Sequence, residues 1–417
     1  MTSSEAIHPT PGSRYRRPGV IIGVVVALAF SYGLQMYASV PAFGSIGDSF
    51  NLTLSQISLL VSAFFLGYAA AHIPAGFAAA AWGFKTVAVS GSALLTASTA
   101  LFAVSNHFAL LLISRFVGGM AMSMIVGSAI PIAAGWSRPD RVRITVGGFV
   151  NGLGFTVGAA LALYAWTYIN SGLGWRAGAW IAAVIALVIT LLAAVFLVTP
   201  TNIEHEEFSW NSTMRCFRSK SMWMIGIGSI GAYGGLFTVS QLGPGYAEAE
   251  LGLSASSAGL LSAMMLFLGI PGALFGGYIA DRARRFVPTL RIPAFLMVVC
   301  IFALPFAGPV VFSLALACIG FLGMMYFAPC TVSPGEYPDE ISPRDYGTAL
   351  GLVLTLGNVG AIVFPYLYGN LSERTGTVTG WLALASVAAV ACCALFVTRE
   401  PRTTPSDSLA PSQVTLV

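Results

Sequence analysis

The chain has 417 residues, of which 56% are hydrophobic and only 9% are charged, and its formal net charge is +4. A soluble domain carries about 25% charged residues, so this composition excludes a soluble protein and indicates an integral membrane protein. Anionic lipid at a membrane surface is a sufficient partner for the small positive charge, and we expect no nucleic-acid partner.

Apolar runs long enough to cross a hydrocarbon core of ~30 Å recur along the whole chain. The alternating pattern of membrane strands is absent, so the spans are predicted to be helical. The first run is too long for a cleaved signal peptide, and others follow it. We predict an all-α integral membrane protein with twelve transmembrane helices, at residues 19–43, 55–81, 86–105, 108–135, 144–168, 177–199, 222–245, 255–280, 291–307, 310–332, 347–369 and 380–398.

Lysine and arginine gather on one side of these predicted spans. With the N-terminus inside, two of the 20 Lys and Arg residues, Arg176 and Arg374, lie in outer loops, one, Arg115, lies inside a span, and the other 17 lie on the inner side. This asymmetry follows the positive-inside rule. We therefore predict a multi-pass protein of the cell membrane, plasma or inner, with both termini in the cytoplasm.

The predicted spans divide into two sets of six around a polar segment near mid-chain. We expect a cytoplasmic tail at 1–18, a first six-helix half at 19–199, a cytoplasmic linker at 200–221, a second half at 222–398, and a disordered cytoplasmic tail at 399–417. Trp210, Met214 and Phe217 at helical spacing would allow a surface helix in the linker, but a plain tether is the preferred interpretation.

Short matches between the two sets of spans indicate an internal duplication. The matching segments, in order along the chain, are 52–55 with 251–254, 62–63 with 262–263, and 76 with 277. Their offsets of 199, 200 and 201 differ by single residues. We therefore predict two halves related by pseudo-symmetry.

A charged loop follows the eighth predicted span. Gly277, Asp281, Arg282 and Arg285 fit the pattern Gly-x-x-x-Asp-Arg-x-Gly-Arg-Arg, with Arg284 in place of the second glycine. This pattern is similar to the loop signature of the major facilitator superfamily of secondary transporters, which the chain resembles over nearly its whole length. The resemblance implies two six-helix halves that rock about a central site.

The first half keeps only part of that loop signature. Gly76, Gly83 and Lys85 remain, but Ala80 and Ala81 replace the acidic and basic pair. An acidic residue at the end of one helix can cap the N-terminus of a helix in the other half and meet an arginine there. We therefore expect an asymmetric latch on the cytoplasmic side, with Asp281, Arg282, Arg285 and Lys85 as gating residues. The alternative is that this loop only anchors two helices at the interface.

The fourth predicted span contains Arg115, followed by Gly118 and Gly119, which resembles the family's Arg-x-x-x-Gly pattern. A charge inside the membrane normally faces a cavity or a partner. Arg115 is therefore predicted to bind an anion or to tune proton transfer, and the alternative is a structural hydrogen-bond centre. The fifth span resembles the family's glycine-rich fifth helix but lacks the Gly-Pro pair of its drug–proton exchangers.

Polar residues on the spans that the resemblance places around the central cavity are the candidate substrate ligands. Tyr68 and His72 are spaced i, i+4 and are predicted to share a helix face, and His72 is the candidate for proton coupling. Tyr37 and Ser123 are further polar candidates on these spans. The predicted substrate-binding set is Arg115, Tyr32, Gln35, Asn151, Tyr233, Gln241, Tyr326 and Asn358.

The predicted spans carry no acidic residue near mid-membrane. A site with one arginine, amides and phenols but no acid favours anions or neutral solutes. We predict a monomeric secondary transporter for a small organic anion of the carboxylate type, proton-coupled or exchanging, with no cofactor, no metal and no enzymatic activity. The alternatives are proton-driven efflux of hydrophobic drugs and a transporter-like receptor that moves nothing.

Overall fold

The computed structural model describes residues 17–138, 144–200, 214, 216–283, 285–341 and 346–401. Every regular element within these ranges is a helix, and twelve segments are long and apolar enough to cross a membrane. The prediction of an all-α protein with twelve transmembrane helices is therefore confirmed. Most of the predicted linker and tail, residues 201–213 and 402–417, lies outside the described ranges.

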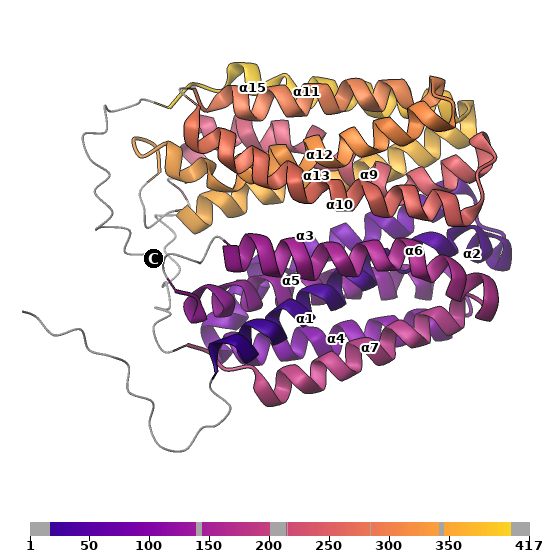
Figure 1. Ribbon diagram of the computed structural model, residues 1–417, viewed down its shortest axis with the longest axis horizontal. Helices are drawn as coiled ribbons and strands as arrows, with labels where there is room; N and C mark the ends of the chain where they lie inside the picture. The colour runs from indigo at the N-terminus through magenta and orange to yellow at the C-terminus, as the bar shows by residue number, and fades with distance from the viewer. Residues whose placement is uncertain are drawn as a thin grey trace, which may run out of the picture.

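The helices form two bundles, one from each half of the chain (Figure 1). The first bundle contains α1 (Pro18–Tyr37), η1 (Val40–Ala42), α2 (Phe43–Phe50), α3 (Leu54–Trp82), α4 (Phe84–Val104), α5 (Phe108–Trp136), η3 (Ile144–Phe155), α6 (Thr156–Leu173) and α7 (Trp175–Phe196). The second contains α9 (Lys220–Leu251), α10 (Ala255–Arg282), α11 (Val287–Ala303), η4 (Leu304–Phe306), α12 (Pro309–Val332), η5 (Ser333–Glu336), α13 (Tyr346–Thr375), α14 (Thr377–Cys392) and α15 (Ala394–Val397). Across the boundary α3 packs on α13 and α6 packs on α10.

The predicted spans differ from the helices mainly at their ends. The first span was expected as one helix over 19–43, but α1 ends at Tyr37 and Pro41 lies in the short 3₁₀ turn that follows. Proline lacks the backbone N–H that would continue the hydrogen bonding of α1. The fifth span begins as a π-helix, η3, before α6 continues it. The eleventh span is longer than predicted because α13 extends to Thr375.

The same helix crossing occurs in both halves, which supports the predicted duplication. In the first half a Cβ on Gly119 of α5 would overlap the backbone carbonyl of Phe64 in α3. In the second half a Cβ on Gly320 of α12 would overlap the carbonyl of Met265 in α10. Glycine therefore allows each helix pair to approach closely. Both residues of the second pair lie 201 positions after their counterparts.

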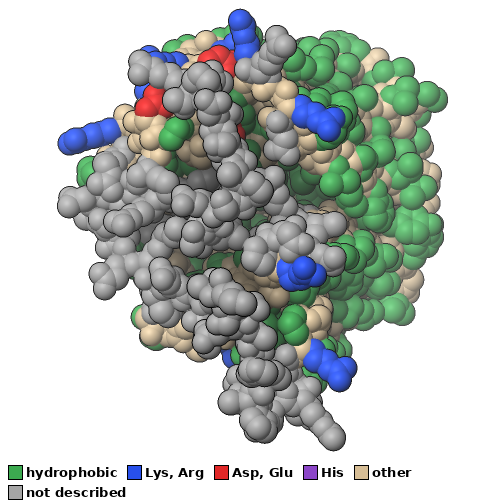
Figure 2. All heavy atoms as spheres, turned by 60° about the vertical axis from the view of Figure 1, so that its left-hand side comes forward, with side chains coloured by type: hydrophobic (Ala, Val, Ile, Leu, Met, Phe, Trp, Pro, Cys, Tyr) green, Lys and Arg blue, Asp and Glu red, His purple; other side chains and the backbone are tan. Residues whose placement is uncertain are grey.

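The two ends of the bundle differ in charge. We call the end where α1 begins and α15 ends the terminal face, and the other end, where α2 lies, the opposite face (Figure 1). Lys and Arg side chains gather at the terminal face, while hydrophobic side chains cover the flank beside it (Figure 2). Exposed basic residues there include Arg17, Arg138, Arg218, Arg282 and Arg285.

Candidate functional site

Arg115 joins two helices of the first half through backbone carbonyls. Its Nε donates to the Leu60 oxygen at 3.3 Å, and Nη1 and Nη2 donate to the oxygens of Gln35 at 3.2 Å and Met36 at 3.1 Å. The guanidinium also lies 4.5 Å from the centre of the Phe64 ring. Gln35 and Met36 belong to the last turn of α1, where carbonyls lack helical partners. Arg115 therefore caps the end of α1 and ties it to α3.

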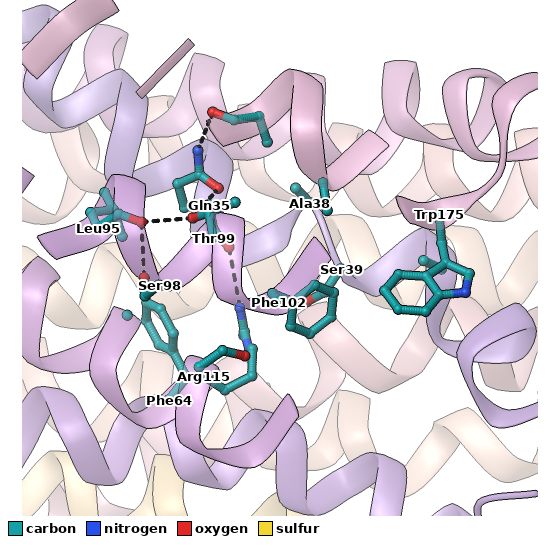
Figure 3. Close-up of a pocket in the computed structure, with 15 residues that line it drawn as sticks. Gln35, Ala38, Ser39, Phe64, Leu95, Ser98, Thr99, Phe102, Arg115 and Trp175 are labelled. Carbon is teal, nitrogen blue, oxygen red and sulfur yellow. Dashed lines mark hydrogen bonds between the residues drawn. The ribbon is translucent and has the colours of Figure 1, made fainter. Parts of the chain in front are cut away.

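The side chain of Gln35 is also hydrogen bonded to residues of the first half. Its Nε2 donates to the Ala182 oxygen of α7 at 2.7 Å, and its Oε1 accepts from the Thr99 hydroxyl of α4 at 3.0 Å. Both polar atoms of the buried amide thus have partners on neighbouring helices (Figure 3). Gln35 therefore connects α1 with α4 and α7.

A small cavity lies beside Arg115 and Gln35, enclosed by first-half residues that include Ser98, Ser114 and Trp175 (Figure 3). Its volume is about 30 Å³. That space is enough for a water molecule, whereas pockets for small organic ligands measure ~300–1,000 Å³. The structure therefore gives Arg115 and Gln35, two predicted substrate ligands, partners within the protein and no room for an organic acid beside them in this conformation.

Phenolic side chains of both halves lie near the boundary between them. Tyr68 of α3 lies within electrostatic range of Tyr32 in α1 and of Tyr233 in α9. Tyr233 is in turn within range of Tyr326 in α12, whose hydroxyl is 2.7 Å from the Ser229 hydroxyl. We call Tyr32, Tyr68, Tyr233 and Tyr326 the phenol cluster.

His72 adjoins the phenol cluster one helical turn after Tyr68. The two ring centres are 4.8 Å apart, so the predicted common helix face is confirmed. The Nδ1 atom of His72 lies 2.8 Å from the Ser123 hydroxyl of α5, and either atom can donate, depending on the histidine tautomer. Tyr68 and His72 are half-buried. A titratable ring is thus held in a fixed orientation beside the phenols.

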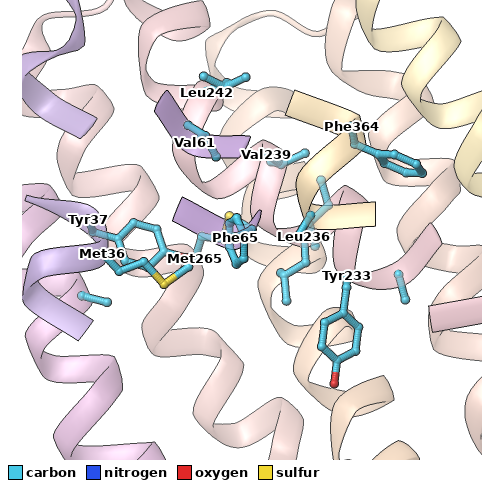
Figure 4. Close-up of a cluster of buried hydrophobic side chains, with 14 of the residues drawn as sticks. Met36, Tyr37, Val61, Phe65, Tyr233, Leu236, Val239, Leu242, Met265 and Phe364 are labelled. Atoms are coloured by element: carbon cyan, nitrogen blue, oxygen red, sulfur yellow. The ribbon is translucent and has the colours of Figure 1, made fainter. Parts of the chain in front are cut away.

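Aromatic rings connect the two halves next to the phenol cluster. Phe65 of α3 meets Phe237 of α9 with ring centres 4.8 Å apart. Tyr233 contacts Phe237 at 6.0 Å and Phe327 of α12 at 5.6 Å. In Figure 4 the Tyr233 hydroxyl points away from the apolar side chains around Phe65 and Leu236. The phenol cluster therefore lies beside an apolar contact between the halves.

That apolar contact lies on the side of the phenol cluster toward the opposite face. Along α9, which runs from the terminal face, Val239 and Leu242 follow Tyr233, and along α3, which runs the other way, Val61 precedes Tyr68. We name as the apolar seal the buried side chains of Met36, Val61, Phe65, Val239, Leu242 and Met265 (Figure 4).

Polar contacts also join the two halves near the opposite face. The Tyr37 and Ser240 hydroxyls are hydrogen bonded at 3.0 Å. The carboxylate of Glu373 accepts from the backbone N–H of Ser55 at 3.3 Å and from the Ser55 hydroxyl. Glu373 thus caps the start of α3, to which the side chains of Thr53 and Gln56 also contribute a capping box. These contacts join the two halves at the opposite face in this conformation.

Two of the predicted gating residues at the terminal face, Arg282 and Lys85, contact residues of their own halves. The Arg282 guanidinium bonds to the Tyr278 hydroxyl and lies 4.2 Å from the centre of that ring, in the same helix. The backbone N–H of Lys85 donates to the Thr199 hydroxyl at 3.2 Å. Arg285 is exposed. The side chain of Asp281 lies outside the described part of the structure, so the predicted latch stays a prediction.

The remaining predicted ligands differ in whether their side-chain polar atoms have hydrogen-bond partners. Asn358 donates from Nδ2 to the Leu354 oxygen of its own helix at 2.9 Å. Asn151 is half-buried in the π-helical η3. The Tyr233 hydroxyl and both side-chain polar atoms of Gln241 are buried without a hydrogen-bond partner among the described residues. A buried unpaired polar group costs about 1–3 kcal/mol, so these atoms are suited to receive a partner.

Sequence reasoning missed Glu373 and Ser55. They are 318 residues apart, and no local spacing indicates their contact. Within the part of the chain that the structure describes, no group of three or more His, Cys, Asp or Glu side chains is placed to hold a metal ion. Arg115 is the only charged side chain among the described residues that is buried.

Comparison with known proteins finds similar membrane transporters along most of the chain. The family model described as Major Facilitator Superfamily matches residues 25–340. The chain is 26% identical to a probable sulfoacetate transporter of Cupriavidus necator, over 87% of this chain and 89% of that protein. It is 25% identical to the 3-(3-hydroxy-phenyl)propionate transporter of Escherichia coli, over 94% of this chain and 97% of that protein.

Solved structures share the fold. One is a bacterial homologue of the human lysosomal transporter Spinster, in an inward-facing and unoccupied conformation, which superposes with a TM-score of 0.76 at 15% sequence identity. The match covers 93% of this chain and 98% of that one.

Proposed function

The chain belongs to the major facilitator superfamily, and on that premise we propose that it is a secondary active transporter that carries a small organic anion across the membrane by alternating access. Both relatives described above are named for organic acids. The observation that carries the proposal is the contact of Phe65 with Phe237 across the boundary, beside Tyr233 and the Tyr68–His72 pair. The buried side chains among the described residues include no carboxylate.

The charge balance favours an anion over a cation. The described contacts of the Arg115 guanidinium are to three carbonyl oxygens and a phenylalanine ring, so they leave its positive charge without a counter-ion. Two unit charges about 10 Å apart at an effective dielectric constant of about 20 interact by ~1.7 kcal/mol. Arg115 would thus attract an anion by its field while serving as a structural clamp. The phenols supply hydrogen-bond donors, and the Tyr233 hydroxyl is without a partner among the described residues.

His72 is proposed to couple transport to protons. A protonated imidazole beside Tyr68 would neutralise a bound carboxylate, so that the pair crosses the membrane without net charge. The hydrogen bond between His72 and Ser123 keeps the ring in place in both protonation states, because a hydroxyl can donate or accept. Neutral His72 would release the anion more readily.

Alternating access is proposed to use two gates. The apolar seal, the Tyr37–Ser240 pair and the Ser55–Glu373 contact form the gate at the opposite face. Asp281, Arg282, Arg285 and Lys85 would form the gate at the terminal face when the other opens. We further propose that the terminal face is cytoplasmic and that the protein works as a monomer.

A thermal-shift screen tests the proposal. The purified protein is heated with single carboxylates, sulfonates, neutral sugars and lipophilic cations, because a ligand that binds only the folded state raises Tm. At a concentration 100 times Kd the stabilisation is about 2.7 kcal/mol. We expect a shift with organic anions. A shift with cations or drugs alone would favour the efflux alternative and contradict anion transport.

A further inference from the structure

Several aromatic rings lie at the proposed site, and they affect which kind of organic anion it can bind. The inference rests on the proposed function. Rings of the two halves are in contact through Phe65 and Phe237, and Phe155 of η3 stacks on Tyr32 with ring centres 5.6 Å apart. The rings that surround the boundary are Tyr32, Tyr68, His72, Phe155, Tyr233, Phe237 and Phe327.

Several of these rings keep an accessible edge, and Tyr68 and Phe237 lie near the middle of α3 and α9. Phe155, Phe237 and Phe327 are each half-buried, as are Tyr68 and His72. Phe237 touches a ring of the opposite half, so it faces the boundary and not the surrounding lipid. Tyr32 and Tyr233, behind them, are buried. Accessible ring surface at this depth is suited to contact with an apolar part of a substrate.

Some of the polar groups at the same place are already occupied. The Tyr326 hydroxyl is bonded to Ser229 and the Ser123 hydroxyl to His72. The Tyr233 hydroxyl is buried without a partner. A sugar acid would bring a hydroxyl on most of its carbons, and each one left unpaired costs about 1–3 kcal/mol. A carboxylate on an aromatic ring needs polar partners at one end only.

We propose that the site selects organic acids that carry an aromatic ring. The ring packs against Phe237 and Tyr233, and the carboxylate lies toward the Tyr68–His72 pair. An aromatic pair contributes ~0.5–1.5 kcal/mol beyond the area that it buries, which corresponds to about a twofold to tenfold change in affinity.

Three acids of equal charge test this proposal by isothermal titration of the detergent-purified protein: 3-phenylpropionate, 3-cyclohexylpropionate and glucuronate. We expect 3-phenylpropionate to bind most tightly and glucuronate least. Phe237→Leu should lower the affinity for 3-phenylpropionate by about twofold to tenfold. It should leave the affinity for 3-cyclohexylpropionate nearly unchanged. Phe237→Tyr keeps the aromatic ring and should retain the wild-type affinity for 3-phenylpropionate. That result would show that the position tolerates substitution.

Phe275→Leu is the matched control, because Phe275 stacks on Phe321 and is exposed on the surface of α10. It should change none of the three affinities. Binding of glucuronate as tight as that of 3-phenylpropionate, or equal weakening of both propionates by Phe237→Leu, would overturn the aromatic preference and leave anion transport standing. If no acid binds and a lipophilic cation does, the proposed function itself is wrong.

Discussion

The carboxylate of Glu373, near the end of α13, accepts hydrogen bonds from the backbone N–H and the hydroxyl of Ser55, near the start of α3 in the other half. The N-terminus of a helix carries a partial positive charge, so the carboxylate and α3 attract each other across the boundary. Gly369 lies one turn earlier in α13, and a Cβ there would overlap the Ser58 hydroxyl. In the proposed alternating access, this close contact separates when the opposite face opens.

Glu373→Gln should shift the protein toward the conformation that is open at the opposite face. The amide keeps the shape of the side chain but loses the charge that the helix end attracts. Spin labels on the opposite-face ends of α3 and α13 would report a larger population of long distances, by a few-fold. Glu250→Gln is the control, because Glu250 accepts from Thr377 within the second half. An equal shift in both variants would contradict a latch between the halves.

Gly119→Ala should destabilise the first half by about 1–3 kcal/mol. The added methyl group would meet the backbone of Phe64, which cannot move aside as a side chain can. Thermal unfolding of the purified variant measures the loss. Gly127→Ala in the same helix meets no atom within 4 Å and should leave Tm unchanged or raise it slightly. Similar Tm values for the two variants would show that the close crossing does not matter.

Arg115→Lys should lower stability by on the order of 2 kcal/mol or more, because a lysine ammonium cannot bond to three carbonyls in the fork geometry of a guanidinium. The KM for substrate should change little in the molecules that stay folded. Tm and KM together distinguish a clamp from a ligand. Arg176→Lys, which alters an exposed arginine bonded to the Ser105 oxygen, is the control. A normal Tm with a much higher KM would identify Arg115 as a direct substrate ligand.

His72→Ala should remove the dependence of uptake on a proton gradient and leave exchange of internal for external substrate in place. Exchange needs the binding site and the rocking motion, but it needs no net movement of protons. Uptake and counterflow in liposomes at matched pH separate the two activities. His107→Ala is the control, because His107 is exposed and lies just before α5 at the opposite face. Proton dependence that persists in His72→Ala would exclude His72 as the coupling residue.

Much of the scaffold follows from local sequence. Long apolar runs predict the twelve spans, and the i, i+4 spacing of Tyr68 and His72 predicts their shared face, because both depend on one helix alone. The partners of Arg115 could not be found in this way. They are the carbonyls of residues 55 to 80 positions away, and any residue type could supply them. Contacts between helices depend on the relative register and the crossing angle of the two helices. Neither can be read from the local pattern of a single sequence.

The most direct measurement of the central claim is uptake of a labelled carboxylate by liposomes that contain the purified protein, with an inward proton gradient and empty liposomes as the blank. We predict saturable, concentrative uptake that other organic anions inhibit and organic cations do not. Failure of every carboxylate tested to enter, together with protein-dependent movement of a cation, would contradict anion transport through the site between the two halves.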